Sequence, residues 1–90
     1  MKAKKEAMAG TLESSDVLVT VSPREGEGVE YTIESIVLKQ YGRRIRSVTE
    51  EMTTAAGLTG AAVRVQDRGA LECTLRARLE TALERAAAEP

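Results

Sequence analysis

Residues 29–35, Val-Glu-Tyr-Thr-Ile-Glu-Ser, alternate apolar and polar side chains along their whole length. Successive side chains of a β-strand point to opposite faces of a sheet, so this period of two is typical of a strand with one buried face. The pattern places Val29, Tyr31 and Ile33 on the face toward the core. It therefore predicts a strand that packs against a second layer of the protein.

A second segment of the same kind precedes it. Residues 16–22, Asp-Val-Leu-Val-Thr-Val-Ser, carry Val17, Val19 and Val21 on one face, and β-branched residues favour strands. The intervening residues 23–28 contain one Pro and two Gly among charged residues, which indicates a turn. Two strands joined by a short turn predict an antiparallel β-hairpin.

Apolar residues at spacings of three and four predict two amphipathic helices in the rest of the chain. The first should begin after Ser35, whose hydroxyl can cap a helix. Its buried stripe would comprise Tyr41, Ile45, Val48, Met52 and Ala55. A third strand is predicted over residues 61–66, followed by a turn at 67–69. The second helix should run from about Ala70. Its buried stripe would comprise Leu71, Leu75, Leu79, Ala82, Leu83 and Ala86.

The resulting order, β-β-α-β-α, favours an α+β fold. We expect a two-layer sandwich, a small sheet with the two helices on one face. If the second and third strands are parallel, the first helix would join them by a right-handed crossover. The length of 90 residues fits one domain. We expect residues 1–10, which are small or charged, to form a flexible N-terminal lead-in, and residues 11–90 to form the single domain.

The composition excludes several classes of function. The chain has no histidine, so neither Ser-His or Cys-His catalysis nor a histidine-based zinc site can be built within it. A net charge of −1 and an aromatic content of 2% argue against a nucleic-acid partner. No apolar run approaches the roughly 20 residues of a membrane span, so we expect no membrane partner. A single cysteine and the lack of a signal-peptide core favour a cytoplasmic protein.

Two adjacent hydroxyls are candidates for modification. Ser14 and Ser15 lie in a short polar segment before the first predicted strand, near Gly10 and flanked by Glu13 and Asp16. A mobile exposed segment can be reached by another enzyme's active site. Spacing alone does not set either serine apart from an ordinary loop residue.

Other noticeable residues have ordinary structural explanations. Cys73 lies on the predicted second helix, where a free cysteine is usually a small buried apolar residue; the alternative is a reactive thiol. Asp67 and Gly69 fit a turn and the start of a helix better than they fit ligands. Arg76 and Arg78 could belong to a subunit interface or to a solvated helix face.

The chain has one basic cluster, which comprises Lys39, Arg43, Arg44 and Arg46. Such a run is usually a solvated face. Its functional alternative is a docking surface for an acidic partner or for phosphate groups.

Three segments together resemble the citrate lyase acyl carrier protein family, the gamma subunit of that complex. They are residues 9–16 (Ala-Gly-Thr-Leu-Glu-Ser-Ser-Asp), residues 36–42 (Ile-Val-Leu-Lys-Gln-Tyr-Gly) and residues 67–79 (Asp-Arg-Gly-Ala-Leu-Glu-Cys-Thr-Leu-Arg-Ala-Arg-Leu). The two outer segments are specific in combination, whereas residues 57–62 match least.

The resemblance implies that the serine directly after Leu-Glu, here Ser14, carries the prosthetic group, and that Ser15 is its neighbour. The implied group is a covalent 2'-(5''-phosphoribosyl)-3'-dephospho-CoA, joined by a phosphodiester and loaded by a separate prosthetic-group transferase. Its thiol would carry acetyl and citryl thioesters between the alpha subunit, an acyl transferase, and the beta subunit, a citryl lyase. The complex would cleave citrate to acetate and oxaloacetate, and the carrier itself would be non-catalytic.

Two other functions remain open. The carrier subunit of malonate decarboxylase uses the same kind of prosthetic group, although the Thr-Leu-Glu-Ser and Asp-x-Gly-Ala-Leu motifs favour citrate lyase. An unmodified scaffold or interaction subunit would need no loaded serine. A nucleic-acid binder of similar element order is disfavoured by the charge and the scarcity of aromatic residues.

Overall fold

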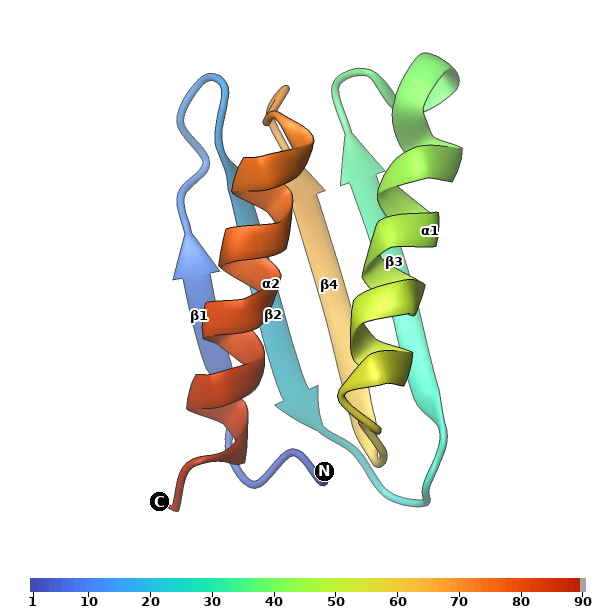
Figure 1. Ribbon diagram of the computed structural model, residues 1–90, viewed down its shortest axis with the longest axis vertical. Coiled ribbons are helices and arrows are strands. Elements are labelled where there is room, and N and C mark those ends of the chain that lie inside the picture. Colours follow the sequence, from blue (N-terminus) through green and yellow to red (C-terminus); the bar gives the residue numbers. More distant parts are fainter. Residues whose placement is uncertain (90) are drawn as a thin grey trace.

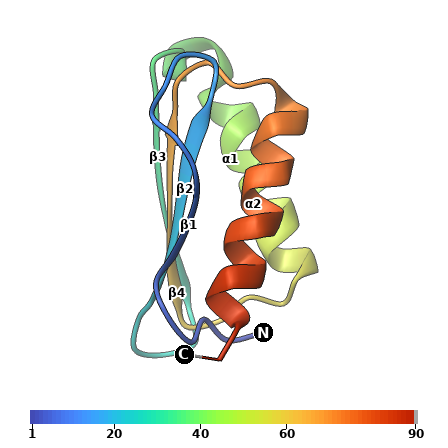
Figure 2. The ribbon, with the colours of Figure 1, turned by 90° about the vertical axis from the view of Figure 1, so that its left-hand side faces the viewer.

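A computed structural model describes residues 1–89, and it places two helices on one face of a four-stranded sheet (Figures 1 and 2). The elements are β1 (Ala7–Gly10), β2 (Val17–Pro23), β3 (Val29–Ser35), α1 (Leu38–Ala55), β4 (Ala61–Asp67) and α2 (Glu72–Ala87). The expected α+β fold with both helices on one face is confirmed, with one strand more than the sequence predicted.

The additional strand is β1. It pairs antiparallel with β2, and Ala7 and Ala9 turn inward while Met8 faces outward. This strand lies within residues 1–10, for which a flexible lead-in was predicted; alanine has little preference for strands, so the sequence pattern does not indicate one here. Lys2 also forms an isolated bridge with Thr59.

The strand order is β1-β2-β4-β3, so the predicted hairpin of neighbouring strands β2 and β3 is wrong. β4 lies between them, antiparallel to β2 and parallel to β3, and α1 makes the connection from β3 to β4. The exposed face of β3 carries Glu30 and Glu34. Charged side chains suit an edge strand, because they discourage pairing with another chain.

The core lies between the sheet and the helices. Valines of β2 and β4 meet Leu79 of α2 and Val48 of α1, all of which are buried almost completely; the valines are Val17, Val19, Val21, Val63 and Val65. The predicted stripe of α2 is confirmed from Leu75 to Ala86. Leu71 is the exception, because it precedes the helix and is 71% exposed.

The predicted stripe of α1 is only partly right. Ile45 and Val48 are buried and Met52 is half-buried, but Tyr41 and Ala55 are exposed; the rest of the buried face consists of Gly42, Thr49 and Thr53. Each threonine hydroxyl donates to a carbonyl oxygen four residues earlier, at 2.8 and 2.9 Å, so it can be buried without losing a partner.

The expected cap at Ser35 is also replaced. The N-cap position of α1 is Val37, which makes no side-chain cap bond. The Ser35 hydroxyl instead accepts a hydrogen bond from the backbone N–H of Val37 at 3.0 Å.

Three connections meet at one end of the molecule, at the top of Figure 1: β1 to β2, β3 to α1 and β4 to α2. The N-terminus and the end of α2 lie at the opposite end. The β1–β2 connection contains Ser14, so the candidate serines share their end of the molecule with the starts of both helices.

Candidate functional site

Ser14 and Ser15 lie in the loop that joins β1 to β2, and both are exposed. Ser15 has a positive φ of 64°, and its backbone N–H donates to the carbonyl oxygen of Arg68 at 2.8 Å. The backbone N–H of Arg68 donates in turn to the carbonyl oxygen of Asp16 at 2.8 Å. The loop is therefore tied to the β4–α2 connection beside it.

Gly10 closes the other side of this loop. Its φ is +96°, and a Cβ atom at this position would lie 1.8 Å from the carbonyl oxygen of Val17. Any side chain here would collide with the backbone of β2. The hairpin that presents Ser14 thus requires glycine at position 10.

Asp16 fixes the base of the loop to α2. Its carboxylate accepts two hydrogen bonds from the Arg78 guanidinium, at 3.1 and 3.0 Å, one from the Thr11 hydroxyl at 2.7 Å and one from the Val17 N–H at 2.7 Å. These bonds lower the pKa of Asp16 from 3.8 to about 2, and the bonds from Arg78 have the largest effect. Asp16 is therefore a structural anion that fastens the loop of the candidate serines to α2.

Asp67 organises the neighbouring connection, as its predicted role in a turn and helix start requires. It is buried and accepts hydrogen bonds from the N–H groups of Gly69 at 3.1 Å and Ala70 at 2.9 Å. The Ser35 hydroxyl donates to the same carboxylate at 2.8 Å. One buried carboxylate thus joins the ends of β3 and β4 to the start of α2.

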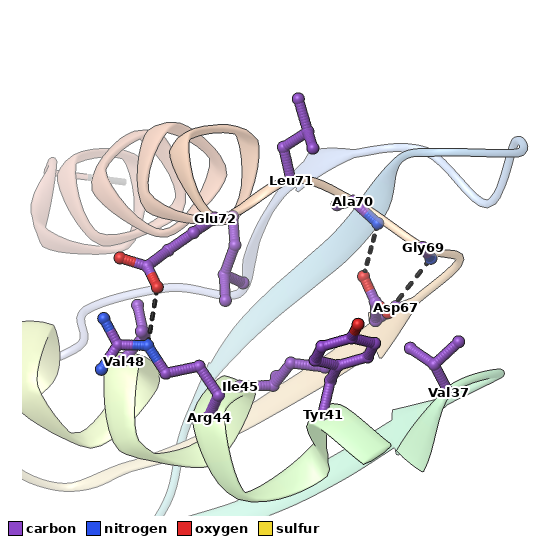
Figure 3. Close-up of a pocket in the computed structure, with 11 residues that line it drawn as sticks. Val37, Tyr41, Arg44, Ile45, Val48, Asp67, Gly69, Ala70, Leu71 and Glu72 are labelled. Atoms are coloured by element: carbon purple, nitrogen blue, oxygen red, sulfur yellow. Dashed lines mark hydrogen bonds and ion pairs between the residues drawn. The ribbon is translucent and has the colours of Figure 1, made fainter. Parts of the chain in front are cut away.

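A groove with a volume of about 480 Å³ opens between the first turns of the two helices (Figure 3). Its walls are mainly apolar: they include Val37, Ile45, Val48, Leu75 and the ring of Tyr41. Arg44 of α1 and Glu72 of α2 bridge its far side at 2.7 Å, whereas Leu71 points away from it in Figure 3.

The predicted basic cluster is divided by the fold. Arg44 pairs with Glu72, and hydrogen bonds from Arg44 and then Arg76 lower the pKa of Glu72. Arg46 pairs with Glu50 at 2.8 Å and lies over the ring of Tyr31.

The other two members of the cluster, Lys39 and Arg43, are exposed. Neither belongs to an ion pair within residues 1–89. Half of the cluster is therefore paired with carboxylates of the same chain, and the other two cations are unpaired among the described residues.

Cys73 is exposed, so the prediction of a buried thiol is wrong. It lies two positions before the buried Leu75, on the opposite side of α2. Across residues 1–89 the structure has no cluster of three side chains that could hold a metal ion, and neither helix is long and apolar enough to cross a membrane.

Known proteins match this chain over nearly its whole length. The chain is 48% identical over 87 residues to the citrate lyase acyl carrier protein of Streptococcus mutans serotype c, a match that covers 97% of this chain and 85% of that protein. It is 47% identical to citrate lyase acyl carrier protein 2 of Salmonella typhimurium, covering 97% of this chain and 90% of that protein. The chain belongs to the citrate lyase acyl carrier protein family. As a family member it is a carrier rather than a catalytic subunit.

A second group of carriers is also similar. Residues 4–86 match the acyl carrier family described as malonate decarboxylase delta subunit (MdcD). A chain in the crystal structure of a Pseudomonas malonate decarboxylase hetero-tetramer in complex with malonate superposes with a TM-score of 0.83 and 20% identity. The superposition covers 94% of this chain and 87% of that one. At this identity the comparison shows a shared fold.

Asp16 was predicted only as a neighbour of the serines and Arg78 only as a solvated or interface residue, so their ion pair was not expected. The two residues are 62 positions apart. Their opposite charges were visible in the sequence, yet nothing in the spacing indicated that α2 would bring Arg78 under the loop.

Proposed function

We propose that this chain is the acyl carrier subunit of a citrate lyase, with Ser14 as the attachment site of phosphoribosyl-dephospho-CoA. The observation that carries the proposal is an exposed serine on a hairpin whose base is fixed by Asp16 and Arg78, in a chain from the citrate lyase carrier family. A loop held at its base and open at its tip suits a hydroxyl that must be offered to other active sites.

The residues around Ser14 fit a phosphodiester-linked group. The serine is exposed, and the side-chain hydrogen bonds of the loop come from Thr11 and Asp16 instead. Ser15 is the rival hydroxyl, but its backbone is held by Arg68 at a positive φ. Because the chain has no histidine, activation of the serine hydroxyl falls to the prosthetic-group transferase.

When bound, the group supplies a thiol that links acyl groups as thioesters. The carrier contributes proximity, because a tethered acyl group meets each active site at a high effective concentration. We propose an acyl transferase (alpha) subunit and a citryl lyase (beta) subunit as the sites between which it moves. The exposed free thiol of Cys73 suits a reducing compartment, which supports a cytoplasmic location.

The test is the intact mass of the protein after co-expression with the prosthetic-group transferase. Wild type should gain the mass of the prosthetic group on the peptide that contains Ser14. Ser14→Ala should abolish the gain, whereas the matched control Ser15→Ala should retain it. An adduct on Ser14→Ala as complete as on wild type would refute the site, and an unmodified wild type would favour a scaffold subunit.

The carrier of malonate decarboxylase is the second candidate, favoured by the match of residues 4–86 to that family. The mass of the adduct cannot separate the two functions, since both use the same kind of group. The loaded protein should therefore be offered to citrate lyase subunits and to malonate decarboxylase subunits in parallel. Acceptance by the malonate decarboxylase subunits alone would decide for the second candidate.

A further inference from the structure

Most of the exposed large apolar side chains lie at the end of the molecule that carries Ser14. Seven such residues are exposed within residues 1–89, and five of them are at this end; they are Leu12, Ile36, Leu38, Tyr41 and Leu71. We propose that this carrier-end surface docks on the rim of an active site in a partner enzyme subunit. The inference rests on the proposed carrier function and identifies the surface that the partner recognises.

Leu12, Ile36 and Leu71 come from the three connections at this end, and the other two residues lie in the first turn of α1. Ile36 lies beside Gly69, and Tyr41 and Leu71 both border the groove between the helices. Leu12 belongs to the same loop as Ser14. A partner that covers this surface would therefore receive the arm at the edge of the contact, directed toward its own active site.

The apolar side chains at this end are highly exposed and form a group. Leu71 is 71% exposed and Ile36 is 65% exposed, although both adjoin the polar turn around Asp67. Single exposed apolar residues are normal, but a group of them at a functional site marks an interaction surface. The open face of the sheet, at the back of the molecule, carries mainly polar and charged side chains; they include Glu6, Thr20, Thr32, Arg64 and Gln66.

The charged residues around the carrier-end surface indicate the charge of the partner's binding surface. Lys39, Arg43 and Arg68 are exposed there and have no ion-pair partner in the part of the chain that the structure describes. The neighbouring anions Asp16 and Glu72 are already engaged by arginines, so Glu13 is the one unpaired anion of the Ser14 loop among the described residues, against three unpaired cations. Free cations beside an apolar centre fit a partner whose active-site rim is acidic around an apolar patch.

The groove offers a different occupant, the arm of the carrier itself. Its apolar walls could shelter a pendant chain between reactions. We favour the partner enzyme because the most exposed residue of the group, Leu71, points out of the groove rather than into it (Figure 3).

The test measures the affinity of the Ser14→Ala carrier, which lacks the arm, for purified alpha and beta subunits of the citrate lyase. Leu71→Ser should weaken binding to at least one subunit by about tenfold, as truncation of a buried interface anchor does. Its matched control is Met8→Ser, because Met8 is also an exposed large apolar residue but lies on the open face of the sheet. The control should bind like the parent, and thermal unfolding should show that both variants fold.

Charge reversal gives an independent measurement. Lys39→Glu with Arg43→Glu should slow association and reduce its dependence on salt, because rim charges act mainly on the rate of encounter. Lys2→Glu, near the opposite end, makes a single charge reversal and should leave the association rate nearly unchanged.

The outcomes separate the inference from the proposed function. If the parent binds but the Leu71 and charge variants bind equally well, the docking surface is wrong and the carrier function stands. If the parent binds neither subunit, the inference is also overturned, and the carrier function is judged by the adduct on Ser14. If Leu71→Ser leaves binding unchanged but Tyr41→Ser, which removes a ring that lines the groove, speeds alkylation of the thiol in the loaded carrier, the occupant is the arm and not a partner.

Discussion

Replacing Gly10 by alanine should destabilise the hairpin that carries the candidate serine, and two other glycines provide matched controls. At Gly10, φ is +96° and a Cβ would lie 1.8 Å from the carbonyl oxygen of Val17 and 3.2 Å from the Arg78 side chain. Gly26 has a similar φ of +85° but nothing within 4 Å of its added Cβ. Gly28 has open space around it and no positive φ. The three positions therefore separate the effect of φ from the effect of the collision.

The positive φ alone costs an alanine about 1–2 kcal/mol, because its Cβ approaches a carbonyl oxygen. Gly26→Ala should lose about that much, whereas Gly28→Ala should change the free energy of unfolding by less than about 0.5 kcal/mol. At Gly10 the collision with the backbone of β2 adds roughly 1–3 kcal/mol of overpacking, for a total loss of about 2–5 kcal/mol. The stability of a whole domain of this size is roughly 5–13 kcal/mol.

Urea denaturation measures these differences, with the slope of the transition checked for each variant. The rate at which the transferase modifies each variant under native conditions would report on the hairpin itself. A loss for Gly10→Ala that is no larger than the loss for Gly26→Ala would refute the close approach of Gly10 to Val17. Modification of Gly10→Ala at the wild-type rate would show that the transferase does not depend on the hairpin.

Three further predictions concern Asp16, Asp67 and Cys73. Because the pKa of Asp16 is held at about 2, below its ordinary 3.8, its ionisation stabilises the folded state above about pH 4, and this contribution is lost as the pH falls toward 2. Thermal unfolding of wild type should show that loss, and thermal unfolding of Asp16→Asn should not. If both proteins lost stability equally as the pH falls, Asp16 would be excluded as the acid-sensitive anchor. Asp67→Ala should lower the free energy of unfolding in urea by about 1–3 kcal/mol, because it leaves the N–H groups of Gly69 and Ala70 without their acceptor, and Asp67→Asn should lose less. Cys73 should react with a thiol reagent in the folded protein at close to its rate in urea, and slow labelling of the folded protein would contradict its exposure.

Apolar periodicity was sufficient to locate the longer elements, but not to arrange them. The alternation in residues 29–35 and in residues 16–22 correctly predicted two strands, and their proximity in sequence suggested a hairpin. The structure inserts β4 between them, because a strand with a buried valine face can pair on both edges and the charged β3 is better placed outside. Periodicity along one strand carries no information about which strand lies next to it.

The same limit applies to the candidate site. The resemblance singled out Ser14, and the structure places that serine in an exposed loop. The ion pair of Asp16 with Arg78 depends on tertiary packing and could not be read from the spacing. Cys73 shows a different error, in which the average tendency of cysteine to be buried was preferred over its helical position. Two residues before the buried Leu75, a side chain falls on the outward side of the helix.

The ties that shape the β1–β2 loop come from residues that are synthesised much later. Ser14 leaves the ribosome before the partners of its neighbours Ser15 and Asp16, which are Arg68 and Arg78. The loop reaches its final form only after the sheet is complete and α2 has docked. A loading enzyme that recognises this form would pass over unfinished or misfolded chains and would modify only carriers that have folded.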